Sequence, residues 1–214
     1  MKVCVVGANG QIGKLLIDQL VESGVHTPRA MVRKQGQLAY FDDKGVETVV
    51  ASIAAGVEQI VEAINGCDAI VFTAGSGGHT GADQTLLIDL DGAVKTIEAA
   101  ETAGIKRFVM VSALGAHKRE NWNEAIRPYY VAKHYADKML ALSELTYTII
   151  RPGGLLNEDG TGKVTIGEEL VRGSIPRTDV AKTIVAALTE QNTFYRSFDL
   201  VSGDIPISDA LKNF

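Results

Sequence analysis

Three glycines close to the N-terminus have the spacing of a turn that binds phosphate groups. The pattern G-x-x-G-x-x-G over residues 7–13 follows a short apolar run and precedes a helical pattern of hydrophobic residues. In such a turn the first glycine permits the tight bend, the second lets a pyrophosphate approach the backbone, and the third lets the helix pack closely on the strand. The helix N-terminus then presents unpaired N–H groups to the phosphates. The sequence therefore predicts a dinucleotide site, whose expected contacts in this turn are Gly7, Asn9, Gly10, Gln11, Ile12 and Gly13.

The end of the second expected strand indicates which dinucleotide binds. A carboxylate about 20 residues after the last glycine usually accepts hydrogen bonds from the ribose 2′-hydroxyl of NAD. In this chain that position is Arg33, and Lys34 follows it. A guanidinium and an ammonium group can pair with the 2′-phosphate that distinguishes NADP from NAD. We therefore expect NADP(H) as the cofactor, with Arg33 and Lys34 among its contacts.

Short apolar runs alternate with longer amphipathic segments along the chain. Apolar strands separated by helices are typical of a parallel sheet that is covered on both faces. The sequence therefore predicts an α/β fold, a doubly wound parallel Rossmann sheet of about seven strands with helices on both faces, as a single domain over residues 1–214. The expected strands are 2–7, 27–34, 46–52, 68–75, 106–113, 146–154 and 196–203, and the expected helices are 11–24, 57–66, 83–103, 127–144 and 178–190, with a final helical turn at 208–214.

Two segments interrupt this alternation, and both follow strands. Residues 75–83 form a glycine-rich loop after the fourth strand, and residues 114–126 form a polar insertion after the fifth. Ligands of doubly wound folds bind outside the carboxyl ends of the strands. We therefore expect both segments to lie at the end of the sheet that binds ligands.

Composition and charge argue against several other classes of protein. The chain has 21 basic and 26 acidic residues, whereas nucleic acids and anionic membranes bind basic surfaces. No apolar stretch approaches the roughly 20 residues of a membrane span, and the N-terminus does not have the pattern of a signal peptide. The two cysteines make no disulfide framework, and the four histidines lack the spacing of metal ligands. We expect a cytoplasmic protein with reduced thiols and no metal site.

Four segments, in order along the chain, resemble the short-chain dehydrogenase/reductase superfamily. They are GANGQIG at residues 7–13, VSALGA at 111–116, YYVAK at 129–133 and IIRPGGL at 149–155. The match is closest to the atypical branch of compact NAD(P)-binding proteins, which are often described as NAD-dependent epimerase/dehydratase-like. The resemblance covers nearly the whole chain.

The resemblance implies a catalytic set of a serine followed by Tyr-x-x-x-Lys, which here is Ser112, Tyr129 and Lys133. The tyrosine hydroxyl would exchange a proton with a carbonyl or alcohol oxygen of the substrate. The lysine ammonium would favour the phenolate form of the tyrosine and would bind the nicotinamide ribose. The serine would orient the same substrate oxygen through a hydrogen bond. Tyr130 is adjacent to Tyr129 but does not have the required spacing to Lys133.

The resemblance also implies cofactor contacts at the ends of three further strands. Relatives often have Gly-Asp beside the adenine after the third strand, and many have Asn-Ala-Gly after the fourth. The turn after the sixth strand would pass the nicotinamide, because a proline fixes the bend and two glycines allow close backbone approach. The expected contacts at these places are Ser52, Thr73, Ala74, Gly75, Pro152, Gly153 and Gly154.

The part of the chain after the sixth strand is short, and a small segment within residues 151–178 would cover the active site. In this superfamily a large sugar-nucleotide substrate normally needs a longer C-terminal region. The resemblance therefore favours an NADP(H)-dependent oxidoreductase that transfers hydride to or from a small carbonyl, quinone or flavin-like substrate. Two alternatives stay open: a non-catalytic NADP(H)-binding regulator that senses redox state, and a compact sugar epimerase or isomerase. The resemblance is compatible with a monomer or a homodimer.

Overall fold

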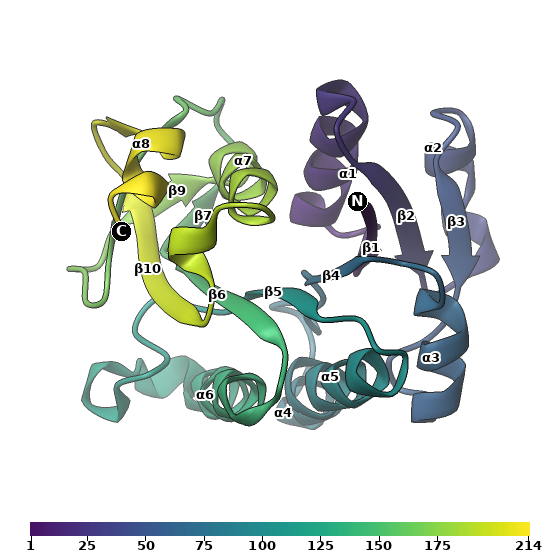
Figure 1. The fold of residues 1–214 in the computed structure, drawn as a ribbon. Helices are drawn as coiled ribbons and strands as arrows, with labels where there is room; N and C mark the ends of the chain where they lie inside the picture. The colour runs from purple at the N-terminus through teal and green to yellow at the C-terminus, as the bar shows by residue number, and fades with distance from the viewer.

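A nine-stranded sheet forms the centre of the molecule (Figure 1). The computed structural model describes all residues from 1 to 214. The strands of this sheet are β1 (Lys2–Val6), β2 (Thr27–Val32), β3 (Glu47–Val50), β4 (Ala69–Phe72), β5 (Arg107–Val111), β6 (Thr146–Pro152), β8 (Lys163–Gly167), β10 (Arg196–Ser202) and β11 (Ile205–Pro206). Their order across the sheet is β11-β8-β10-β6-β5-β4-β1-β2-β3. Strands β1 to β6 and β10 run parallel to one another, which confirms the doubly wound parallel sheet.

The strands that were not expected all lie late in the chain. Strand β8 pairs antiparallel with β10, and β11 pairs antiparallel with β8, at one edge of the sheet. A separate two-stranded sheet contains β7 (Gly154–Leu156) and β9 (Ser174–Pro176). These four strands have two to five residues each. In β8 only Val164 is fully buried, so the sequence lacks the apolar run that predicts the other strands.

Helices cover both faces of the sheet, as Figure 1 shows. One face carries α1 (Gln11–Ser23), α2 (Ala39–Asp42), α7 (Arg177–Ala187) and α8 (Ile207–Lys212). The other carries α3 (Val57–Ile64), α4 (Ala82–Gln84), α5 (Gly92–Thr102) and α6 (Arg127–Leu142). Each face buries its own hydrophobic core, with Leu16 and Ile184 in one and Ile60 and Leu140 in the other. Apart from the short α2, each of these helices overlaps a segment that the sequence predicts as helical, with starts that differ by at most one residue for α4, α7 and α8.

The helix expected over residues 83–103 is not one regular α-helix. It begins as α4, continues as a π-helical stretch, η2 (Thr85–Asp91), and ends as α5. A π-helical turn is wider than an α-helical turn, so it changes which side chains face inward, and such turns are frequent at functional sites. In η2 the apolar Leu86 and Leu87 are exposed, whereas the charged Asp89 is almost fully buried.

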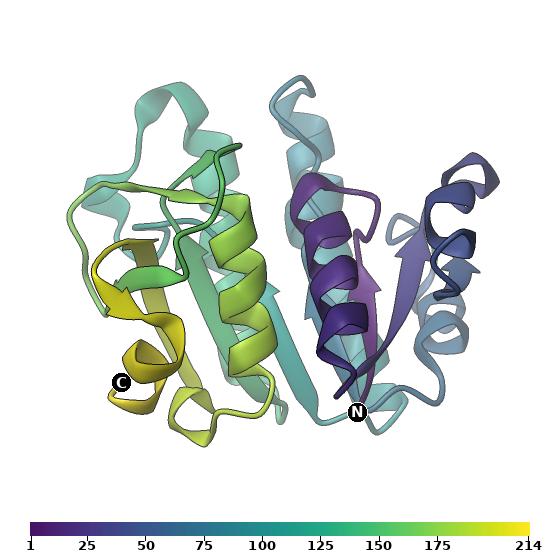
Figure 2. The ribbon, with the colours of Figure 1, turned by 90° about the horizontal axis from the view of Figure 1, so that it is seen from above.

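The order of the strands reverses at β1, which lies between β4 and β2. Connections that leave such a point on opposite faces of the sheet open a crevice at the carboxyl ends of the strands. Val6 and Phe72, the last residues of β1 and β4, are register partners, so the segments that follow them meet there. In Figure 2 the helices α1 and α7 lie side by side over one face of the sheet. None of the helices has the length and apolar character that crossing a membrane requires.

Candidate functional site

Two adjoining cavities lie along the carboxyl ends of the strands. The β2-side cavity has a volume of about 350 Å³ and extends from the glycine turn to Arg33 and Ser52. The β5-side cavity has a volume of about 670 Å³ and extends from the glycine turn to Ser112 and Lys133. The residues that line both cavities are Gly10, Thr73, Ala74, Gly75, Ser76 and Thr80. The two cavities therefore form one continuous cleft beside the point where the strand order reverses.

The glycine turn has the geometry that its spacing predicts. Gly7 has a φ of 86°, and a Cβ atom there would lie 2.7 Å from the backbone of Ala74. A Cβ atom on Gly13 would collide with the carbonyl oxygen of Gly7, so only glycine lets α1 pack this closely on the end of β1. Gly10 lines both cavities, and its N–H donates to the Gly7 carbonyl over 2.9 Å. Asn9 lines the β2-side cavity, and the next two residues of the turn, 11 and 12, line the β5-side cavity.

The β2-side cavity has one charged lining residue, Arg33. No aspartate or glutamate lines it, and Ser52 and Gln37 supply polar groups. Lys34 does not line the cavity; its backbone N–H and that of Arg33 donate to Oε1 of Gln37 over 3.1 and 3.0 Å. The structure thus brings Arg33 and Ser52 together at one end of the cleft and leaves Lys34 beside it.

The β5-side cavity is lined by all three residues of the implied catalytic set. Ser112 directly follows β5, while Tyr129 and Lys133 lie one helical turn apart near the start of α6. The Nζ atom of Lys133 lies 5.6 Å from the centre of the Tyr129 ring and donates to the Val111 carbonyl over 3.4 Å. Ser112 is only 3% exposed, and its hydroxyl makes no well-formed hydrogen bond within the chain, although it lies near enough to the Asp137 carboxyl to lower the pKa of that group. A buried hydroxyl without a partner is costly and is available to a ligand.

An acidic residue that the sequence analysis missed completes this group. Asp89 of η2 lines the β5-side cavity, and its Oδ1 atom lies 3.3 Å from Nζ of Lys133. Its Oδ2 atom accepts a hydrogen bond from the Ser76 N–H over 2.9 Å. No sequence signal predicts this contact, because an aspartate on an amphipathic helix is expected to face solvent. The π-helical geometry of η2 turns it inward instead.

Burial and charge shift the pKa values of the tyrosine and the lysine in the same direction. Burial raises the pKa of Tyr129, and the nearby Lys133 ammonium lowers it only in part. For Lys133, burial favours the neutral amine, but Tyr129 and the Asp89 carboxylate outweigh burial and raise its pKa. Lys133 therefore lowers the pKa of Tyr129, as the resemblance implies, but burial raises it by more. A raised pKa leaves Tyr129 a neutral phenol near neutral pH, so the adjacent Asp89 carboxylate is what favours the ammonium form of Lys133 there.

The turn after β6 contributes less to the cavity than expected. Pro152 lines the β5-side cavity, whereas Gly153 and Gly154 do not. A Cβ atom on Gly153 would collide with the carbonyl oxygen of Gly173, and the Gly154 N–H donates to the same oxygen over 2.9 Å. These glycines thus let the turn approach the backbone at Gly173, directly before β9. Their contact with the cofactor stays a prediction.

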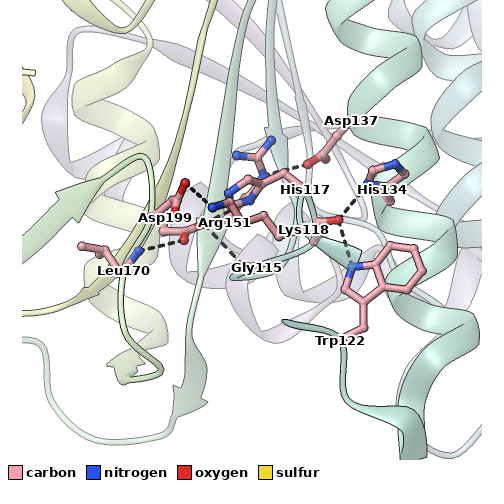
Figure 3. A network of polar contacts seen from close by, with 11 residues as sticks. Gly115, His117, Lys118, Trp122, His134, Asp137, Arg151, Leu170 and Asp199 are labelled. Atoms are coloured by element: carbon pink, nitrogen blue, oxygen red, sulfur yellow. Dashed lines mark hydrogen bonds and ion pairs between the residues drawn. The ribbon is translucent and has the colours of Figure 1, made fainter. Parts of the chain in front are cut away.

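The polar insertion 114–126 is fastened to strand β10 of the sheet and to α6 (Figure 3). In this network Nε of Arg151 donates to Oδ2 of Asp137 over 2.8 Å, and both side chains are buried. Nδ1 of His117 lies 3.9 Å from Oδ1 of Asp199. The carbonyl of Ala116 accepts the Trp122 indole N–H over 3.1 Å and lies 2.9 Å from the His134 ring, which holds the insertion against α6.

The fold and the cleft together define a dinucleotide-binding protein of the Rossmann class. The chain belongs to the NAD(P)H-binding family, whose family model matches residues 7–191. It is 62% identical over 212 residues to a Bacillus subtilis (strain 168) protein named uncharacterized sugar epimerase YhfK, and the match covers 99% of each chain.

Solved structures agree with this assignment. A Bacillus halodurans protein named putative NAD-dependent epimerase/dehydratase matches with a TM-score of 0.95 and 44% identity over 100% of both chains. The oxidoreductase ylbE from Lactococcus lactis matches with a TM-score of 0.91 and 34% identity, over 100% of this chain and 96% of its own. The resemblance to the atypical branch of the short-chain dehydrogenases/reductases is thereby confirmed. The roles of individual residues and the choice between NAD and NADP stay predictions.

Proposed function

We propose that this protein is an NADP(H)-dependent oxidoreductase that reduces a small carbonyl, quinone or flavin-like compound. One observation carries the proposal: Ser112, Tyr129 and Lys133 line a single cavity that continues into the glycine turn. These residues supply a proton donor, an ammonium group and an orienting hydroxyl beside a dinucleotide cleft. Such a set can protonate and orient a carbonyl oxygen while the carbonyl carbon accepts a hydride.

The residues of the cleft suit NADP(H) from one end to the other. The N–H groups at the start of α1 and the glycine turn bind the pyrophosphate, and Arg33 pairs with the 2′-phosphate at the far end of the β2-side cavity. Lys133 binds the nicotinamide ribose, at the other end of the cleft. When bound, the nicotinamide supplies the hydride. The absence of a carboxylate in the β2-side cavity supports NADP over NAD, since nothing there repels a phosphate.

The protonation states suit the steps of a carbonyl reduction. Tyr129 is a neutral phenol at neutral pH, so its hydroxyl can donate a proton to the oxygen of a carbonyl that accepts hydride. The Lys133 ammonium stabilises the phenolate that this donation leaves behind, and Asp89 keeps the ammonium in place. The Ser112 hydroxyl donates a hydrogen bond to the same substrate oxygen.

The proposal is tested by NADPH oxidation against a panel of aldehydes, quinones and flavins. Tyr129→Phe removes the proton donor, so we expect turnover to fall by about 10²- to 10⁴-fold while NADPH affinity is retained. Tyr130→Phe is the matched control, because Tyr130 stacks on Trp122 and does not line the cavity. Unchanged turnover in Tyr129→Phe would remove the tyrosine from the mechanism.

The epimerase alternative is supported by the names of two relatives. An epimerase oxidises its substrate and reduces it again in place, so it causes no net change in NADPH. The short segments around β7 and β9 leave little chain to enclose a sugar nucleotide. Conversion of a sugar nucleotide without net NADPH oxidation would favour the epimerase, and tight NADPH binding without any turnover would favour the redox-sensing regulator.

A further inference from the structure

The β5-side cavity contains a positive charge that the proposed reaction does not use. Arg177, the first residue of α7, lines this cavity with the implied catalytic set. Its Nη1 atom donates to the Leu155 carbonyl over 3.1 Å and to Oδ1 of Asn157 over 2.7 Å. These two bonds fix the guanidinium to the segment after β6 and leave its Nε and Nη2 donors without an acceptor in the chain.

No carboxylate of the chain balances this charge. Arg177 forms no ion pair, and the only acidic residue that lines the cavity is Asp89. Asp89 already pairs with Lys133, the other cation of the cavity. The cavity therefore presents one ion pair and one uncompensated guanidinium, so its unpaired charge is positive. A planar guanidinium with free donors binds a carboxylate or a phosphate more strongly than it binds a neutral group.

The remaining wall indicates what kind of molecule carries the anion. Ile126, Pro128 and Leu155 line the cavity with apolar surface. Ser112 lies on the same cavity with a buried hydroxyl that makes no well-formed hydrogen bond within the chain. The cavity thus offers a hydroxyl for an uncharged oxygen, an apolar wall for a hydrocarbon body and a guanidinium for an anionic group.

We propose that Arg177 forms an anion subsite and that the substrates are small carbonyl compounds carrying a carboxylate or similar anionic group on an apolar body. The inference rests on the proposed function, because it assigns the substrate class of the same site. The substrate's anion suits Arg177 better than the cofactor's pyrophosphate does, since the glycine turn and α1 already supply donors for the pyrophosphate. Moreover, Arg177 is anchored to the segment that the sequence predicts as the cover of the substrate.

The first test measures binding without turnover. Benzoate and benzamide are titrated calorimetrically into the protein saturated with NADPH. We expect benzoate to bind more tightly than benzamide, and Arg177→Gln to weaken benzoate about 10- to 100-fold with little effect on benzamide. Arg177→Lys keeps the charge and should restore part of the benzoate affinity. The matched control is Lys182→Gln, which removes a cation from the same helix outside the cavity and should change neither affinity.

The second test measures selectivity during turnover. The wild type should have a lower KM for 4-carboxybenzaldehyde than for its neutral methyl ester, and Arg177→Gln should abolish that difference. Equal affinities of the wild type for benzoate and benzamide would overturn the subsite. A loss of NADPH affinity in Arg177→Gln as large as the loss of benzoate affinity would overturn it too. If both aldehydes are reduced and Arg177→Gln changes neither KM, the subsite fails and the proposed function stands. If neither is reduced but benzoate binding depends on Arg177, the reaction fails and the subsite stands.

Discussion

Nζ of Lys133 lies 3.3 Å from Oδ1 of Asp89, and both side chains are at least nine-tenths buried. The pair joins α6 to the π-helical stretch η2 at the wall of the β5-side cavity. It keeps the lysine charged inside the protein, where burial alone would favour the neutral amine. Asp89 is therefore placed to hold the lysine that the family resemblance implicates in catalysis.

Removal of one member of this pair leaves an uncompensated buried charge. We expect Asp89→Asn to lower the free energy of unfolding by about 3–5 kcal/mol, because the Lys133 ammonium loses its partner. The double variant Asp89→Asn/Lys133→Met removes both charges and should cost less than the sum of the two single variants by about 0.5–3 kcal/mol. Urea denaturation of the four proteins measures this coupling. Additive losses would mean that the two charges do not stabilise each other.

The close contact of α1 with the glycine turn makes Gly13 intolerant of any side chain. In Gly13→Ala the new methyl group would collide with the Gly7 carbonyl oxygen, so α1 must shift away from β1. We expect a loss of about 1–3 kcal/mol in stability and weaker NADPH binding. Gly36→Ala is the control, because a Cβ atom there meets nothing within 4 Å. If Gly13→Ala bound NADPH with wild-type affinity, the turn would not hold the pyrophosphate.

The choice of cofactor depends on the charge at the end of β2. Arg33→Asp replaces the one cation of the β2-side cavity with a carboxylate that suits a ribose 2′-hydroxyl. Loss of the charge-assisted hydrogen bonds should reduce the preference for NADPH over NADH by about 10- to 100-fold. The dissociation constants of both nucleotides, measured by fluorescence titration, give this ratio. A ratio equal to that of the wild type would show that Arg33 does not contact the 2′-phosphate.

Buried histidines make the stability depend on pH. Burial lowers the pKa of His134, while its contact with the Ala116 carbonyl acts in the opposite direction without cancelling that shift. The unfolded chain therefore binds more protons than the folded chain below about pH 6.5, and the free energy of unfolding falls as the pH falls through that range. His26 and His117 have lowered pKa values for the same reason.

The contribution of His134 is isolated by comparing pH profiles. Burial raises the pKa values of Asp137 and Asp199, which opposes the histidines at lower pH in both proteins. His134→Asn should therefore lose less stability than the wild type between about pH 7.5 and about pH 5.5. Urea denaturation across this range gives both slopes. Identical slopes would mean that His134 is protonated equally well in the folded and unfolded chains.

Local patterns predict the parts of this structure that are built from neighbouring residues. The glycine turn is such a part, because its three glycines lie within one strand-to-helix connection. The seven parallel strands are another, since each carries its own apolar run. Ser112, Tyr129 and Lys133 follow from the resemblance, and they line one cavity.

Contacts between distant segments leave no such pattern. Asp89 reaches Lys133 only because η2 is π-helical, and the order of apolar residues in that helix suggests the opposite orientation. Arg177 becomes part of the cavity because α7 begins beside the segment after β6. The pair between Asp137 and Arg151 joins a helix to a strand. The short strands after β6 have too few buried residues to be recognised from their sequence.

The binding of NADPH to the purified wild-type protein tests the central claim most directly. Isothermal titration calorimetry should give saturable heat with one NADPH per chain, and the affinity should be lower for NADH. A crystal of the complex should then show the pyrophosphate against residues 7–13. Absence of heat at millimolar NADPH, together with an empty cleft in crystals soaked in the nucleotide, would contradict the account.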